Sequence, residues 1–285
     1  AESADNACGA IRPFYWEVGD RDARLASGSV NAAGSSRAVT GDQVLAIASA
    51  SKWVYGAYVA QVRGGVLSAE DQRFLSLRAG YVSLAGCDVT QTVDGCLASK
   101  ANGAYTAASD GKFDYNGGHL QKHASLMMGL GALNSQALTA AVQAQIGTDV
   151  ALQYTRAQPA GGLNMSADAY ARMLRKMLGG ELLIGQLLGS GAVCTNPISC
   201  GYGQALYTPT PAGESWHYTA GHWVEDDPLV GDGAFSSGGA FGFYPWIDAT
   251  KTSYGIVARS ASNGGTPSAL CGRLIRKAWA SGVAL

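Results

Sequence analysis

The sequence predicts an α+β fold, in which both ends of the chain build one antiparallel sheet that is flanked by helices, with an all-α region in the middle. Strand-like patterns occur near residues 14–18 and again over 240–259, whereas helical periodicity fills most of the chain between them. A cysteine also lies near each end, at Cys8 and Cys271. The expected single unit spans residues 1–285, with a sheet region of about 1–48 and 235–285 and a helical region of about 49–234.

The first expected elements are two strands and a helix. Residues 14–18 alternate enough to form a strand, and a second strand is expected near Val30. The short apolar run over 44–47 leads into a turn of small residues. Residues 51–63 then carry apolar side chains at helical spacing, and Gly64 and the glycine after it end that helix.

The middle of the chain alternates between helices and polar loops. Helices are expected over 118–130, 135–146 and 166–178, and Ser166 is the expected N-cap of the last. One stripe of that helix is apolar, with Tyr170, Met173, Leu174 and Met177. The segments 84–114 and 190–235 are rich in glycine and polar residues, which predicts loops.

The last elements are expected to return to the sheet. The pattern predicts two strands over 240–247 and 254–259. The short polar segment Asp248–Lys251 joins them, which is typical of a β-hairpin. A closing helix is expected over 268–280. A bridge between Cys8 and Cys271 would hold the two ends together, as this topology requires.

Composition excludes two classes of partner. The chain has 285 residues, of which 47% are hydrophobic and 14% charged, and its net charge is −1. Binding to nucleic acid through bulk charge is therefore excluded, because neutralising phosphates needs clustered Lys and Arg. A membrane span is also excluded, because no run of 18 apolar residues occurs.

The six cysteines predict three disulfides and an oxidising compartment. Two pairs lie close in sequence and leave one pair near the chain ends. The predicted bridges are Cys87–Cys96, Cys194–Cys200 and Cys8–Cys271. The alternative is six unrelated thiols in a cytosolic protein. The start AESADNACG lacks a basic or apolar leader, which is typical of a mature bacterial protein, secreted or periplasmic, after signal-peptide removal.

The sharpest chemical motif is SxxK, from Ser49 to Lys52. Three residues make almost one helical turn, so both side chains share a face. A lysine whose pKa is lowered by desolvation can take the proton of a serine hydroxyl and make it a nucleophile. A second match, from Ser109 to Lys112, lies in a glycine-rich loop with no helix to align the pair.

The context of Ser49 resembles the serine β-lactamase-like and penicillin-binding-protein-like hydrolases. Residues 45–52 (LAIASASK) resemble the first motif of that superfamily. Residues 65–71 resemble its GxLSLDD segment, 161–168 its GGLxSxxD helix start with one extra residue, and 239–242 its late strand pair. The resemblance implies a β-lactamase/DD-peptidase-like fold, an acyl-enzyme on Ser49 and no cofactor.

The second motif of the superfamily, Tyr-x-Asn or Ser-x-Asn, has two registers here. One takes Asp114 for the usual Tyr or Ser and keeps Asn116. The other takes Phe113–Tyr115 as the FEY lead-in of esterase-like and nylon-oligomer-hydrolase-like members, which makes Tyr115 the active tyrosine. We favour Tyr115, because its phenol can relay a proton, whereas an ionised Asp114 would raise the pKa of Lys52. The role of Asn116 stays open as a substrate-binding residue.

The third motif, Lys-Thr-Gly or His-x-Gly, has no cation here, since residues 236–240 read SSGGA. In the superfamily that cation helps to hold a substrate carboxylate, so its absence favours an ester or amide without one. Glycines still allow substrate to approach the strand. Ser237, Gly239 and Ala240 are therefore expected at the substrate, with N–H groups of Ser49 and about Ala240 on the oxyanion. A plain glycine-rich bulge is the alternative.

The histidines give no metal motif. His119 and His123 are four residues apart, but Leu120 follows the first, so HExxH fails and a structural pair is expected. The aromatic stretch 216–223, beginning with Trp216 and His217, either lines a substrate pocket or packs under a loop.

Two classes of function follow. The first is a secreted serine hydrolase acting on a small or oligomeric ester or amide, with D-peptidase or β-lactamase activity as its alternative. The second is a non-catalytic module on the same fold that binds peptidoglycan or a β-lactam. No metal site is expected, and the sequence leaves the oligomeric state open.

Overall fold

The computed structural model describes residues 1–285 and is organised around an eight-stranded sheet with the order β2-β1-β13-β12-β11-β10-β9-β7. All seven pairs of neighbouring strands in this sheet are antiparallel. The strands are β1 (Phe14–Asp20), β2 (Arg24–Val30), β7 (Val193–Cys194), β9 (His217–Thr219), β10 (His222–Glu225), β11 (Ala234–Ser236), β12 (Tyr244–Ile247) and β13 (Ser253–Ala258).

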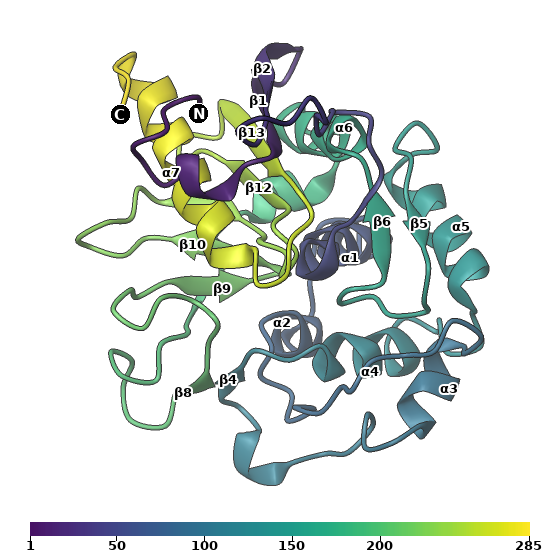
Figure 1. Cartoon of the computed structure of the whole chain (residues 1–285). Coiled ribbons are helices and arrows are strands. Elements are labelled where there is room, and N and C mark those ends of the chain that lie inside the picture. The colour runs from purple at the N-terminus through teal and green to yellow at the C-terminus, as the bar shows by residue number, and fades with distance from the viewer.

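Two small sheets and seven α-helices complete the chain (Figure 1). The small sheets are β3 (Leu45–Ala46), β6 (Leu163–Met165) and β5 (Gln153–Tyr154), and the parallel pair β4 (Phe113–Asp114) and β8 (Ala205–Tyr207). The helices are α1 (Ser51–Val62), α2 (Ala69–Leu75), α3 (Val93–Ala98), α4 (Gly118–Leu126), α5 (Ser135–Ile146), α6 (Ala167–Leu178) and α7 (Gly265–Ser281). None of these helices has the length and hydropathy that a membrane span requires.

Helices cover both faces of the large sheet. Tyr254 of β13 contacts Arg175 of α6, whereas Tyr244 and Trp246 of β12 face α7 on the other side. Gly272 of α7 allows this close packing, because a Cβ there would lie 2.4 Å from the ring of Tyr244. The ends of the chain lie together beside α7 in Figure 1.

The helical middle is anchored by a buried carboxylate, Asp71 of α2. Arg63 donates to it at 3.0 and 3.1 Å, and His123 of α4 bonds it at 3.0 Å. Ser68 caps α2 in a reciprocal capping box with Asp71. Burial opposes ionisation, but hydrogen bonds from Ser68, His123 and Arg63 lower the pKa of Asp71 to about 2.

The predicted α+β fold is confirmed, but the sheet draws on more of the chain than expected. Strands β7, β9 and β10 come from the segment 190–235, which we predicted as loop within the helical region. These strands have two to four residues, too few to show a period of two. The predicted strand over 240–247 is also shorter, because β12 begins at Tyr244 and a turn precedes it.

The three disulfides join the pairs that spacing predicted: Cys8–Cys271, Cys87–Cys96 and Cys194–Cys200. The first connects the segment before β1 to α7. The second closes the loop that leads into α3. The third closes the loop after β7.

Candidate active site

Ser49 stands on a sharp turn between β3 and α1. Ala48, the residue before it, has a φ of 46°, which is uncommon for a residue with a side chain. Ser51 holds this turn, because its hydroxyl donates to Ala48 O at 2.6 Å and accepts from Leu163 N at 3.3 Å. The turn places Ser49 at the wall of a pocket.

Lys52 lies in the first turn of α1 and its amine meets Ser49. The Nζ–Oγ distance is 2.9 Å, and Nζ also donates to Ala160 O at 3.0 Å. The side chain is buried and forms no salt bridge with a carboxylate. Burial lowers the pKa of Lys52 to about 7. Much of the amine is therefore neutral near pH 7, and a neutral amine can accept the Ser49 proton across the same contact.

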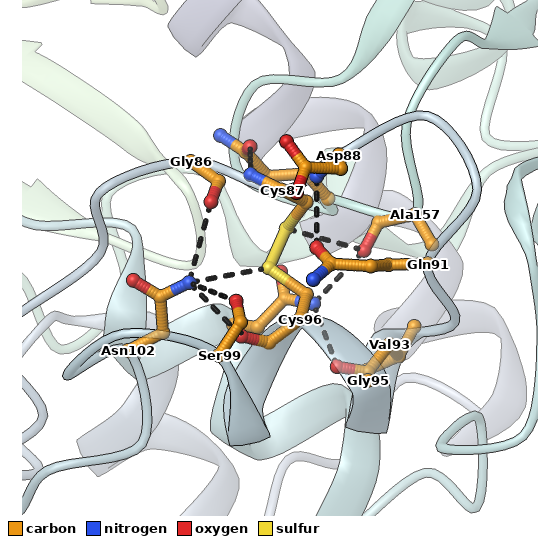
Figure 2. Close-up of a disulfide and its surroundings, with 12 residues drawn as sticks. Gly86, Cys87, Asp88, Gln91, Val93, Gly95, Cys96, Ser99, Asn102 and Ala157 are labelled. Atoms are coloured by element: carbon orange, nitrogen blue, oxygen red, sulfur yellow. Dashed lines mark hydrogen bonds between the residues drawn. A yellow bond between two sulfur atoms is a disulfide. The ribbon is translucent and has the colours of Figure 1, made fainter.

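A disulfide supports the chain that presents Ala160. Figure 2 shows Cys87 and Cys96 beside Ala157, and Cys87 N donates to the side chain of Gln158 at 3.2 Å. Asn102 fixes the other side of the loop by donating to Cys96 O at 2.9 Å. These contacts link the Cys87–Cys96 bridge to the carbonyl that holds Lys52.

Tyr115 closes the pocket beside Lys52. Its N–H donates to Tyr207 O at 3.1 Å, and its ring stacks on Trp223 at 5.2 Å. Lys52 Nζ lies 4.7 Å from the centre of that ring. Burial raises the pKa of Tyr115 to about 12, although a hydrogen bond with Ser49 opposes the rise. The phenol therefore keeps its proton over the ordinary pH range.

The neighbours of Tyr115 serve helix α4 instead of the pocket. The Asn116 side chain accepts from Gly118 N at 2.9 Å, so it caps the start of that helix and does not line the pocket. Asp114 does not line it either, and its carbonyl bonds His119 at 3.1 Å. Of the two registers considered, Tyr115 is the residue that reaches Ser49 and Lys52.

The segment after β11 offers free backbone N–H groups. Ser237 N and Gly239 N donate to Pro245 O and Phe243 O at 3.2 and 2.7 Å. Gly238 N and Ala240 N make no hydrogen bond within the chain, and both residues line the pocket. The sequence predicts that the Ala240 N–H binds the oxyanion of the substrate. It does not single out Gly238, because every residue type except proline carries a backbone N–H and a free one leaves no signal in a sequence.

Close approach fixes this segment against the Ser49 turn. A Cβ on Gly239 would lie 2.1 Å from Ile47 O, so only glycine fits there. Ser237 does not line the pocket, but its hydroxyl lies 3.4 Å from Ser49 O and 3.4 Å from Gly221 O. The strand end and the nucleophile turn therefore form one packed unit.

The pocket has a volume of about 280 Å³ and mostly apolar or uncharged walls. Trp216 and Trp223 line it, so for these two residues the pocket alternative of the stretch 216–223 applies. His217 does not, because its side chain turns away to Asp226 at 2.9 Å, which raises the pKa of His217. The only charged side chain in the wall is Arg273 of α7, which sequence reasoning did not single out.

The remaining sequence motifs serve the fold. His123 bonds Tyr55 at 2.8 Å as well as Asp71, and His119 accepts from Ala79 N at 3.1 Å. Each histidine is therefore held by its own partners within the core. In the second SxxK match, Lys112 and Ser109 are joined only through their backbones, at 3.2 Å.

Comparison with solved structures identifies the fold. No protein-family model and no curated protein sequence matches this chain. D-amino acid amidase from Ochrobactrum anthropi superposes with a TM-score of 0.68 at 10% identity, covering 96% of this chain and 97% of that one. A β-lactamase from Mycobacterium bovis gives 0.61 at 14% identity, covering 96% and 97%.

A third similar structure is a Bacillus anthracis protein assigned as a 6-aminohexanoate-dimer hydrolase. It superposes with a TM-score of 0.60 at 16% identity, covering 96% of this chain and 81% of that one. The chain therefore has the β-lactamase/penicillin-binding-protein-like fold, as the motifs predicted. At these identities the likeness describes the fold, and chemistry has to be argued from the site itself.

Proposed function

We propose that this protein is a serine hydrolase that cleaves a carboxylic ester or amide bond through an acyl-enzyme on Ser49. The contact that carries the proposal is the 2.9 Å approach of Lys52 Nζ to Ser49 Oγ. A buried lysine with a pKa near 7 and no carboxylate partner suits the role of general base. The likeness to amidases and β-lactamases in fold supports the same class of chemistry.

The proposed reaction begins when Lys52 takes the hydroxyl proton as Ser49 Oγ bonds to the carbonyl carbon. The carbonyl electron pair moves to oxygen, and the N–H of Ser49 with that of Ala240 or Gly238 stabilises the oxyanion. The bond to the leaving group then breaks, and Tyr115 passes the proton from Lys52 to it. A water oxygen then bonds to the acyl carbon while the water gives a proton to Lys52. The bond from that carbon to Ser49 Oγ breaks, Lys52 returns the proton to Oγ, and the acid leaves.

The preferred substrate lacks a carboxylate beside the scissile bond. The segment after β11 has no cation, and the one charge in the wall, Arg273, is already paired with Glu214 at 2.7 Å. An ester or amide is therefore ranked before a D-peptide or a β-lactam. A secreted or periplasmic bacterial location is proposed from the three disulfides.

Mixing the protein with p-nitrophenyl butyrate and following its intact mass tests the proposal. We expect a transient butyryl adduct that maps to Ser49, with turnover. Ser49→Ala removes both, whereas Ser109→Ala, in the second SxxK match, keeps both. If wild type and Ser49→Ala show the same background and no adduct, the chain is a binding module and the proposed reaction is wrong.

The pH dependence provides a further prediction. Because Lys52 must be neutral to act, kcat/KM is expected to rise with pH around 7, the pKa that burial gives the amine. It should then stay level, because the pKa of Tyr115 is about 12 and the phenol remains protonated. Ester hydrolysis between pH 5 and 10 checks this. A rise centred near 10, or a fall between pH 8 and 10, would contradict these roles.

A further inference from the structure

Three uncharged stretches of sequence line most of the pocket. No Asp, Glu, Lys, Arg or His occurs between Glu181 and Glu214, between Asp232 and Asp248, or between Arg259 and Arg273. These stretches supply most of the lining residues, namely 209–211, 238–240, Tyr244 and the five positions Asn263, Gly265, Thr266, Ala269 and Leu270. Segments far apart in the chain thus converge on a pocket whose one charged wall residue is Arg273.

Three exposed apolar side chains belong to these lining segments or stand next to them in the sequence. Tyr207 is 54% exposed and precedes the lining segment 209–211. Phe241 is 45% exposed and follows Ala240, and Leu270 of α7, 39% exposed, lines the pocket itself. Single exposed apolar residues are common on proteins, but Leu270 belongs to the pocket wall, and each of the other two lies within two residues of a lining position in the sequence. We call them the apolar rim.

The one cation in the wall does not offset this character. Arg273 donates to both oxygens of Glu214, at 3.3 and 2.7 Å, and lies 3.6 Å from the buried Glu225. Its guanidinium also lies over the ring of Trp216 at 5.6 Å. A carboxylate entering here would meet a cation that two carboxylates already neutralise, and it would lose its hydration.

We infer that the substrate of this enzyme carries an uncharged, apolar acyl chain that fills the pocket and continues over the apolar rim. The inference rests on the proposed function and narrows its substrate class. Each methylene that leaves water on the rim or in the pocket stabilises the bound chain. A charge at the far end of the same chain gains no partner there.

A series of p-nitrophenyl esters tests the inference, because the leaving group stays constant. The acyl groups are acetyl, butyryl, octanoyl and the suberic monoester, which matches octanoyl in length but ends in a carboxylate. A fully buried methylene is worth about a fourfold gain. With part of the chain exposed, we expect kcat/KM to rise roughly 30- to 100-fold from acetyl to octanoyl, and to fall at least about tenfold for the suberyl ester.

Two rim variants and a control sharpen the test. Phe241→Glu is expected to lower the ratio of octanoyl to acetyl kcat/KM several-fold, and Phe241→Lys to raise the ratio of suberyl to octanoyl. Val66→Glu, at a position 77% exposed in the turn after α1, leaves both ratios unchanged.

The outcomes separate this inference from the proposed function. Ser49-dependent turnover that is equal for acetyl and octanoyl, or for octanoyl and suberyl, overturns the inference and leaves the hydrolase intact. Absence of Ser49-dependent turnover for every ester, acetyl included, overturns the hydrolase and the inference with it. The expected chain-length gain, together with rejection of the suberyl ester, supports both.

Discussion

Lys52→Met is expected to lower kcat/KM for an activated ester by about 10²- to 10⁴-fold, the usual contribution of a general base. Methionine keeps the apolar stem and fits the buried site, but it cannot take the Ser49 proton. The same variant should be more resistant to urea at neutral pH. Burial disfavours the charged amine, and this penalty disappears with the charge.

The gain in stability has a defined pH dependence. The pKa of Lys52 in the folded protein lies below its ordinary value. Between about pH 7 and pH 10.5 the unfolded chain therefore binds more protons at this amine than the folded protein does. Wild-type stability therefore rises with pH across that window, and the advantage of Lys52→Met is largest below it. Lys112→Met, in the other SxxK match, should change neither rate nor stability. A Lys52→Met enzyme that keeps most of its activity would exclude Lys52 as the base.

Asp71→Asn is expected to lower the free energy of unfolding by about 3–5 kcal/mol, because it leaves buried partners unmatched. The carboxylate joins Arg63, Ser68 and His123, which belong to three different parts of the helical region. An amide cannot accept from all three. Urea unfolding at pH 7 measures the loss, and the matched change Glu70→Gln, one residue away on an exposed side chain, should cost little.

The effect of Asp71→Asn should also fade in acid. The pKa of Asp71 is lowered to about 2, so its contribution is complete above about pH 4 and is lost as pH falls towards 2. The stability curves of wild type and variant therefore converge in that range. A difference that stays constant from pH 7 to 2 would mean that Asp71 acts through packing instead of charge.

The fold was predictable where local pattern and tertiary role agree. Helix α6 combines a serine N-cap with an apolar stripe, and β13 belongs to a hairpin with a polar turn, so both were predicted from sequence. Strands β9 and β10 are three and four residues long and pair with each other, while β10 also pairs with β11 and β9 with β7. Their own residues specify no period, so only the assembled sheet defines them.

The site was predictable for its side chains and not for its backbone. Ser49 and Lys52 are neighbours in the chain, so helical geometry alone brings them together. Ala160 O and Gly238 N reach the same place through tertiary packing, and any residue type carries such groups. The side chains of Asn116 and His217 could bind a substrate by their chemistry. In the structure Asn116 accepts from Gly118 N instead, and His217 bonds Asp226.

The Cys8–Cys271 bridge turns most of the chain into a covalent ring. Its two cysteines are 263 residues apart in sequence, and Asn6 bonds the carbonyl of Leu285 at 2.7 Å beside them. Tension applied to the two termini is therefore borne by the sulfur–sulfur bond and cannot pull β1 from β13. A circular permutation that fuses the two ends and opens the backbone at an exposed turn such as Asp248–Lys251 would leave the connectivity of the fold almost unchanged. Under such tension, the chain between the two cysteines behaves as a closed loop that is joined at one disulfide.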